Sequence, residues 1–184
     1  MIRFGRVEVT GGFLLLLAWL NYLDRSLLIP MAMLACTAHE LGHFFVIRAF
    51  GKDIKQICLT AIGAEMVLSD PLGYWQEGVS ALAGPGVNLL LALVCCGFEE
   101  GLAFTGLNLM LALFNLLPVG RLDGGRALHC TLALLGGPDL AERVRGWLDC
   151  LCMAGSLVAG LWLAVFGGNI TLLLAALWLL ATFF

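Results

Sequence analysis

Long hydrophobic runs, separated by short polar or glycine-rich stretches, dominate the pattern of this 184-residue chain. A helix needs about 20 apolar residues to cross a bilayer core of about 30 Å, and six runs approach or reach that length. They predict spans at about residues 9–23, 27–50, 75–98, 101–117, 147–166 and 170–184. We therefore expect an all-α polytopic membrane protein with about six transmembrane helices.

The stretch from Ile54 to Leu68 departs from this helical pattern. It follows Gly51 and is rich in Ile, Leu, Thr and Val around a central Gly63. It is too short and too interrupted to cross a membrane as a helix. Aliphatic and β-branched residues on both sides of a glycine are typical of two strands and a turn. We predict a short membrane-associated β-hairpin after the second helix, with a re-entrant segment as the alternative.

The composition supports a membrane protein and narrows the classes of partner. The chain is 61% hydrophobic and 12% charged, with a mean hydropathy of +0.97, well above an ordinary soluble domain. A net charge of -3 and the lack of a basic tract give no reason to expect nucleic acid. Because no Pro/Ser-rich linker or repeat divides the sequence, we expect one domain over residues 1–184 in contact with the lipid bilayer.

Basic residues predict the orientation of the spans, because cytoplasmic loops contain an excess of Lys and Arg. With six spans and a cytoplasmic N-terminus, only Arg25 of the ten basic residues falls outside. The other nine fall inside: Arg3, Arg6, Arg48, Lys52, Lys55, Arg121, Arg126, Arg143 and Arg145. This topology places the polar residues of the second span near the cytoplasmic face.

A polar motif interrupts the second span, where charge is costly. His39 and His43 stand four residues apart, with Glu40 between them. On a helix, residues four apart share a face, so both imidazoles can reach one metal ion while the glutamate lies beside its open position. This pattern is typical of zinc peptidases.

A catalytic zinc ion usually has three protein ligands, so one ligand is missing from this motif. A metzincin is excluded, because Ala49 stands where its third histidine would be and Val46 replaces its glycine. Glu65 follows His43 by 22 residues, and the hairpin could return it to the site. Asp123 follows by 80 residues, in a glycine-rich stretch. The residues alone leave both candidates open.

Two glycine-rich stretches suggest local disruption of helices. The glycines of residues 119–125 predict irregular backbone. Irregular backbone is tolerated near a membrane only when it is buried in protein or lines a wet cavity. In the third span, Pro85 between two glycines predicts a kink with freed carbonyl groups. Asn88 follows that kink, and we interpret it as a structural residue that bonds to a neighbouring helix.

Three motifs together resemble the signatures of one protein family. The chain is similar to the site-2 protease family of intramembrane zinc metalloproteases, and most of all to its stage IV sporulation protease branch. The resemblance covers about residues 36–128, half of the chain. The motifs are His39-Glu40-Leu41-Gly42-His43, Gly84-Pro85-Gly86-Val87-Asn88 and Asn115-Leu116-Leu117-Pro118-Val119-Gly120-Arg121-Leu122-Asp123-Gly124-Gly125-Arg126.

The resemblance implies a function and chooses between the two candidate ligands. It implies one Zn²⁺ held by His39, His43 and Asp123, with Glu40 as the catalytic base. It also implies regulated intramembrane proteolysis of a membrane-tethered protein near the cytoplasmic face, with an inhibitory or activating membrane partner as a further possibility. We find no PDZ insertion and expect no C-terminal regulatory domain. The alternative is a non-catalytic metal-binding carrier or scaffold.

Three further residues are candidates for contacts with a substrate. The amide of Asn115 could stabilise the oxyanion, or it could form an interhelical hydrogen bond. The other two are Gly63 and Glu65 in the hairpin, where the family often has a glycine pair and this chain has Ile62-Gly63-Ala64-Glu65. An unpaired strand edge there could hold an unwound substrate as an added strand, and Glu65 could orient it or be a solvated carboxylate.

Overall fold

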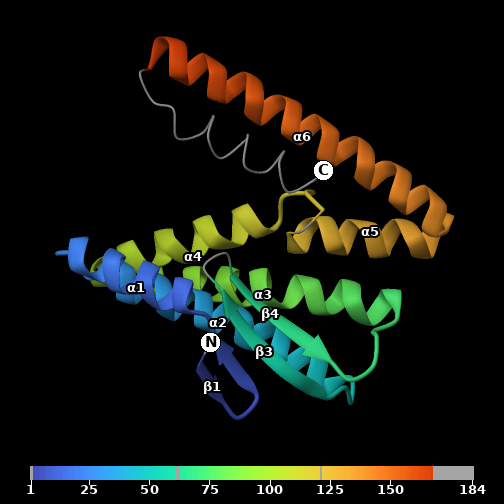
Figure 1. Ribbon diagram of the computed structural model, residues 1–184, viewed down its shortest axis with the longest axis horizontal. Coiled ribbons are helices and arrows are strands. Elements are labelled where there is room, and N and C mark those ends of the chain that lie inside the picture. The colour runs from blue at the N-terminus through green and yellow to red at the C-terminus, as the bar shows by residue number, and fades with distance from the viewer. Residues whose placement is uncertain (1, 61–62, 121, 168–184) are drawn as a thin grey trace.

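The computed structural model describes residues 2–60, 63–120 and 122–167, and these form a mostly helical protein (Figure 1). The predicted sixth span, residues 170–184, lies outside the described residues. The second, third and fourth predicted spans are helices with bounds close to those expected. The helices are α1 (Gly11–Leu23), α2 (Leu28–Ala49), α3 (Tyr74–Cys95), α4 (Leu102–Asn115), α5 (Asp123–Gly136) and α6 (Pro138–Phe166), with a 3₁₀ turn at Glu99–Gly101.

Two of these helices are long and apolar enough to cross a membrane by length and composition. They are α3 and α6, whose most apolar 18-residue windows have mean hydropathies of 1.8 and 1.9. Only 33% and 11% of those windows are buried, whereas the core helix of a soluble protein would be mostly buried. Helices α1 and α4 are apolar but shorter. The described residues therefore support two spans, and the predicted number of six is not shown.

The predicted hairpin is present and is part of a larger sheet. Strands β3 (Ile54–Thr60) and β4 (Gly63–Leu68) are antiparallel. The sequence did not predict two N-terminal strands, β1 (Ile2–Phe4) and β2 (Val7–Val9), of which β2 pairs in parallel with β3. Strands of three residues are too short to give a recognisable alternation. The order is β1-β2-β3-β4, so within the described residues β4 has one unpaired edge.

Helices α2, α3 and α4 lie side by side and alternate in direction (Figure 1). Helix α2 has a buried face toward its neighbours, and Ala35, His39 and His43 lie on that face. Gly42 allows a close approach on this face, because a Cβ atom there would lie 2.8 Å from the carbonyl oxygen of Ala83 on α3. Both histidines of the motif are therefore placed at the contact between α2 and α3.

The glycine-rich stretch before α5 is more regular than predicted. Asp123 is the first residue of α5, and Gly124 and Gly125 lie inside the helix. A Cβ atom on Gly124 would lie 2.7 Å from the carbonyl oxygen of Leu117, so only glycine lets α5 pack against the preceding segment. The prediction of irregular backbone was wrong for residues 123–125, because close packing, not a loop, requires these glycines.

Helix α3 is continuous through Pro85, so this proline and its flanking glycines do not break the span as we expected. The kink predicted at Pro85 stays a prediction. Pro85 and Gly84 are both buried in the face that packs on α2. The proline therefore removes one backbone N–H from the helix interior without ending the helix.

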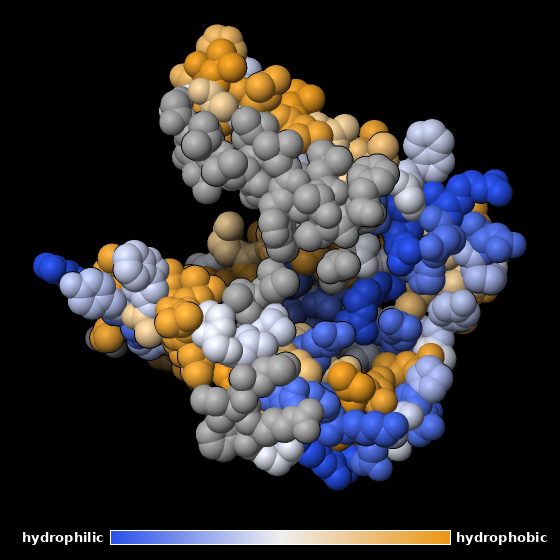
Figure 2. Space-filling model, viewed as in Figure 1, coloured by the Kyte–Doolittle hydropathy of each residue, from blue (hydrophilic) through white to orange (hydrophobic). Residues whose placement is uncertain are grey.

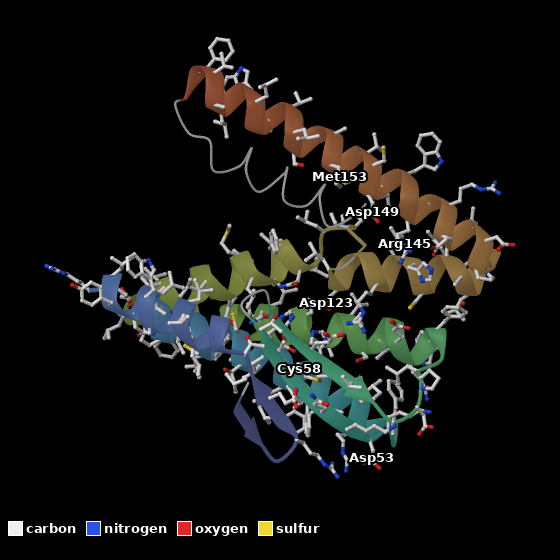
Figure 3. The ribbon with its side chains drawn as sticks, in the orientation of Figure 1. Asp53, Cys58, Asp123, Arg145, Asp149 and Met153 are labelled. Carbon is white, nitrogen blue, oxygen red and sulfur yellow. The ribbon has the colours of Figure 1, made fainter. Side chains whose placement is uncertain are left out.

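Helix α6 is attached to the segment that precedes Asp123. The backbone N–H of Gly120 donates to Oδ1 of Asp149 over 2.8 Å, and this aspartate is buried although it lies on an apolar helix. Figure 3 shows Asp149 on α6 facing the start of α5. This hydrogen bond gives a buried carboxylate a partner and fixes the backbone three residues before Asp123.

Hydrophobic and hydrophilic residues are separated on the surface. On the face shown in Figure 2, hydrophobic residues cover the last turns of α6 and the end of the molecule where α1 and α4 lie. Hydrophilic residues gather at the opposite side, over the start of α6 and the turns beside the sheet. Many large apolar side chains on the described helices are exposed, such as Trp162, which is 61% exposed on α6.

Candidate metal centre

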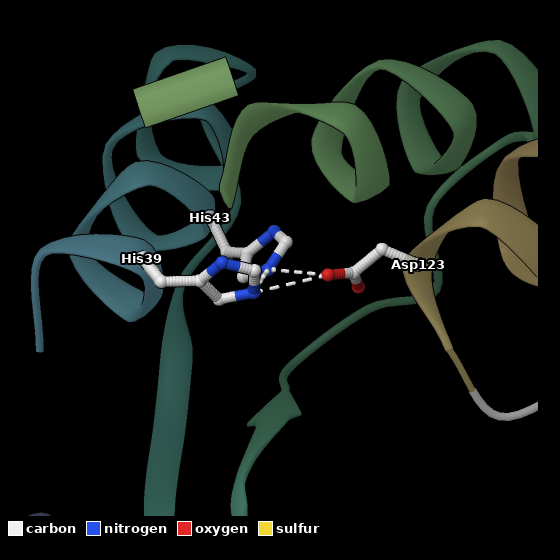
Figure 4. Close-up of side chains that lie close together, drawn as sticks. All are labelled: His39, His43 and Asp123. Carbon is white, nitrogen blue, oxygen red and sulfur yellow. Dashed lines mark hydrogen bonds and ion pairs between the residues drawn. The ribbon is translucent and has the colours of Figure 1, made fainter. Parts of the chain in front are cut away.

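Three buried side chains from α2 and α5 meet at the contact between α2 and α3 (Figure 4). Nε2 of His39 lies 3.0 Å from Oδ2 of Asp123 and 3.1 Å from Nε2 of His43. Nε2 of His43 lies 3.3 Å from the same carboxylate oxygen. Three ligand atoms of the kinds that bind transition metals therefore form a small triangle.

The dimensions of this triangle fit zinc. Tetrahedral zinc has metal–ligand bonds of about 2.0–2.1 Å, which places its ligand atoms about 3.3 Å apart. The measured separations of 3.0–3.3 Å are close to that value. His39, His43 and Asp123 can thus hold one ion and leave a fourth position open for water or substrate.

The hydrogen bonds of the imidazole rings also favour a cation. Nδ1 of His39 donates to Oδ1 of Asn88 over 2.5 Å, and Nδ1 of His43 donates to the carbonyl oxygen of Ser80 over 2.7 Å. In a neutral ring, a proton on Nδ1 leaves a lone pair on Nε2. Two such lone pairs and a carboxylate oxygen then face one another, and a positive ion between them removes the repulsion.

Asp123 is suited to act as an anionic ligand. Burial raises the pKa of its carboxyl, but the N–H groups of charged imidazole rings, the form the rings adopt when no cation lies between the three groups, lower it more strongly, to about 2. The group also lies at the N-terminus of α5, where the helix dipole favours negative charge. Its second oxygen, Oδ1, lies 3.6 Å from the guanidinium of Arg126. At neutral pH the side chain is therefore ionised, with one oxygen facing the histidines.

Glu40 lies beside this group and is free to exchange a proton. Its carboxylate interacts electrostatically with His39, His43 and Asp123. Among the described residues, none forms a hydrogen bond or ion pair with it. A carboxylate next to the open position of a metal site is where a general base is required.

The structure brings Asp123 to the histidines and leaves Glu65 away from them. Glu65 is exposed on β4, opposite Cys58 of β3, and Gly63 is the first residue of that strand, opposite Thr60. The metal-binding group of the described residues contains Asp123 and does not include Glu65. Of the two candidate ligands that the sequence left open, the geometry therefore favours Asp123.

Two other polar residues lie away from the metal-binding group. Asn115 is the last residue of α4, and its side-chain Nδ2 donates to the carbonyl oxygen of Leu111 one turn earlier. In the described part of the chain this amide forms no interhelical hydrogen bond, and its role as an oxyanion donor stays a prediction. His129 of α5 lies 3.5 Å from the carboxylate of Glu142 on α6, at another interface.

The contact of α3 with the imidazole rings was not predicted from the sequence, although Asn88 was expected to bond to a neighbouring helix, as it does. Ser80, Gly84 and Asn88 are four residues apart and lie on one buried face of that helix. Ser80 and Asn88 accept the two Nδ1 protons, and Gly84 faces both rings. On α3 these small and polar residues recur every four residues, the same spacing as the two histidines on α2. That shared spacing was the sequence signal for contact between the two helix faces.

Comparison with known proteins agrees with this site. No protein-family model matches the chain. It is 36% identical over 161 residues to a proposed zinc metalloprotease of Synechocystis, covering 77% of this chain and 41% of that protein. It is 29% identical over 136 residues to a zinc metalloprotease of Methanocaldococcus jannaschii, covering 66% and 40%. The chain is similar to zinc metalloproteases.

The fold has a solved counterpart. The structure of a site-2 protease from Methanocaldococcus jannaschii aligns with a TM-score of 0.67 and 26% identity, over 97% of this chain and 90% of that one. The chain spans less than half the length of the curated relatives that it matches. The names of these relatives and the His39, His43 and Asp123 group confirm the prediction of a zinc cofactor.

Gly84 is expected to be essential for the metal site, because its missing side chain makes room for both rings. A Cβ atom there would lie 2.7 Å from Nε2 of His39 and would also clash with Nε2 of His43. We predict that Gly84→Ala lowers zinc affinity by at least about tenfold, since changes to the groups that orient ligands typically cost 10- to 100-fold.

The matched control is Gly86→Ala in the same helix, where a Cβ atom would meet nothing within 4 Å. It should leave zinc affinity unchanged in a competition assay with a coloured chelator. Equal affinities for the two variants would contradict the assignment of Gly84.

Proposed function

We propose that this chain is a zinc-dependent intramembrane endopeptidase of the site-2 protease type, acting in regulated intramembrane proteolysis. The observation that supports this most is the convergence of His39, His43 and Asp123 beside the carboxylate of Glu40. The similarity to a solved site-2 protease structure adds to it. Within that family, we propose the stage IV sporulation protease branch.

The proposed chemistry is hydrolysis of a peptide bond. A bound zinc ion would supply Lewis acidity toward water and toward the peptide carbonyl. Glu40 accepts the proton of the attacking water and transfers it to the departing amine. His39, His43 and Asp123 hold the ion, and the close contact of α2 with α3 keeps bulk water away from the rings. The amide of Asn115 is a candidate oxyanion donor after a change of rotamer.

The proposed setting is a lipid bilayer, with the N-terminus and the metal centre toward the cytoplasm. The two long apolar helices and the large exposed apolar side chains support a membrane location. The distribution of Lys and Arg supports the orientation. The proposed substrate is a membrane-tethered protein cut within or close to the membrane, and a membrane partner that inhibits or activates the enzyme fits the same setting.

Strand β4 is the proposed docking edge for an unwound substrate. Among the described residues it pairs with β3 alone, so its outer backbone groups can receive an added strand. Helical peptide bonds are shielded, so a substrate must become extended before it is cut. Gly63 at the start of this edge, which bears no side chain to obstruct a strand, and Glu65 further along it are then candidates for contact with the substrate.

Proline substitutions along β4 test this docking edge. We place single prolines at Ala64, Glu65, Met66 and Val67. Successive N–H groups of a strand point to opposite edges, so every second proline should remove an outward N–H and reduce the cleavage rate by about tenfold. Glu65→Gln is the control, because it alters a side chain and leaves the backbone intact. Full cleavage by all four proline variants, with zinc retained, would rule out strand addition.

Metal removal tests the proposed activity. The purified protein should cleave a peptide that contains a transmembrane segment, and exhaustive chelation should reduce the rate at least about a hundredfold, because the ion contributes several kcal/mol of transition-state stabilisation. Stoichiometric Zn²⁺ should restore the rate. A protein that binds zinc but cleaves no membrane peptide would favour the alternative, a metal-binding carrier or scaffold.

A further inference from the structure

Two buried asparagines continue the hydrogen bonds of the metal centre into the helical core. Asn88 on α3 and Asn108 on α4 are both fully buried. Nδ2 of Asn88 donates to Oδ1 of Asn108 over 2.8 Å and to the carbonyl oxygen of Ala35 on α2 over 3.2 Å. Oδ1 of Asn88 accepts from Nδ1 of His39. One chain of polar groups thus connects α4, α3 and α2.

The ends of this chain determine its direction. Nδ2 of Asn108 donates to the carbonyl oxygen of Phe104 over 2.9 Å, and a carbonyl oxygen can only accept. Oδ1 of Asn108 must therefore face Asn88. A reversed Asn88 amide would place its oxygen against two acceptors, the Ala35 carbonyl and Oδ1 of Asn108. Asn88 consequently has only its oxygen available for His39.

We propose that Asn108, acting through Asn88, fixes the tautomer and ring orientation of His39. An acceptor that cannot reverse requires a proton on Nδ1, and this leaves the lone pair on Nε2, the atom that faces His43 and Asp123. His43 obtains the same arrangement from a backbone carbonyl, which needs no second residue. Asn88 and Asn108 are thus positioning residues, and Asn108 acts without touching any ligand.

This inference rests on the proposed zinc site, and it does not require that the protein cleaves peptides. Outside partners of metal-bound histidines orient the ring, and their loss typically lowers metal affinity 10- to 100-fold. Burying a polar group that has all its hydrogen-bond partners costs little folding free energy, whereas a network that lacks one partner is strongly destabilising. The role of each asparagine can therefore be measured as zinc affinity.

The first test compares Asn88→Leu with Asn88→Asp. If Asn88 positions His39, the leucine variant loses the acceptor and should bind zinc about 10- to 100-fold more weakly. The aspartate variant keeps an acceptor for Nδ1 but places an oxygen against the Ala35 carbonyl and Oδ1 of Asn108, so its zinc affinity should lie between those of the leucine variant and the wild type. If the residue only fills space, the order should reverse, because a buried carboxylate is far more costly there than a leucine.

The second test repeats this pair at Asn108. Asn108→Asp still offers an oxygen to Nδ2 of Asn88, whereas Asn108→Leu removes that acceptor and allows Asn88 to rotate. We expect Asn108→Leu to bind zinc more weakly than Asn108→Asp, with a smaller loss of affinity than for the variants at position 88. Asn21→Leu is the control, since the Asn21 side chain is exposed and donates only to its own helix. It should bind zinc like the wild type.

The tautomer itself can be observed by NMR of the zinc-loaded protein labelled with ¹⁵N-histidine. The protein contains three histidines, so three imidazole rings give signals. In the wild type, the His39 Nδ1 proton should exchange slowly with water. In Asn88→Leu and Asn108→Leu it should exchange faster, while the His43 signal is retained. Unchanged exchange in both leucine variants, or a higher zinc affinity for leucine than for aspartate at position 88, would overturn the proposal.

Discussion

Replacing Glu40 with glutamine is expected to abolish peptide cleavage and to leave zinc bound. Glutamine has nearly the same shape, but it cannot accept the proton of the attacking water. A positioned general base contributes typically 10²–10⁴-fold to a rate, so a loss of about that size is predicted. Because Glu40 is not one of the three converging ligand atoms, metal content should stay at one ion per chain.

The measurement combines metal analysis with a search for uncut membrane proteins. Proteins that accumulate in cells with Glu40→Gln, and not in cells with the wild type, are candidate substrates. Glu142→Gln is a matched control, because that carboxylate is exposed and pairs with Arg145 and His129 away from the metal centre. Cleavage by Glu40→Gln at the wild-type rate would exclude the mechanism proposed above.

Replacing Asp123 with alanine is expected to remove zinc from the protein, and replacing Glu65 with alanine is not. Oδ2 of Asp123 lies 3.0–3.3 Å from the Nε2 atoms of the two histidines, whereas Glu65 is an exposed residue of the sheet. Loss of a direct ligand should exceed the 10- to 100-fold loss typical of an outer partner. Asp123→Ala should therefore be purified nearly free of metal.

Inductively coupled plasma mass spectrometry of the two alanine variants gives this comparison directly. Asp123→Asn refines it, because asparagine has the same size but lacks the negative charge that zinc ligation uses. We expect it to bind zinc more weakly than the wild type and more tightly than alanine. Zinc retained by Asp123→Ala and lost from Glu65→Ala would reassign the third ligand to the hairpin.

Sequence reasoning predicted those parts of the site that depend on local spacing. The four-residue separation of His39 and His43 requires a common helical face whatever the rest of the fold, and the structure places both rings there. The hairpin was predicted for a similar reason, since aliphatic residues around Gly63 favour strands. In both cases the residues that carry the signal lie within a short stretch of the chain.

Other features depend on contacts that one sequence does not reveal. The glycines after Asp123 predicted a loop, but Gly124 and Gly125 are helical, because they meet carbonyl groups of the preceding segment. The hydrogen bond from Nδ1 of His39 to Oδ1 of Asn88 joins two helices whose rotation about their own axes is set by packing. Such pairings become predictable only when two neighbouring helices are considered together.

The parallel pairing of β2 with β3 has a mechanical consequence for the proposed enzyme. Residues 7–9 are bonded to residues 57–59, so α1 and α2 belong to a loop whose two ends are tied together. The hairpin therefore cannot move toward the histidines alone, because such a movement would carry β2 with it or break the parallel strand pair.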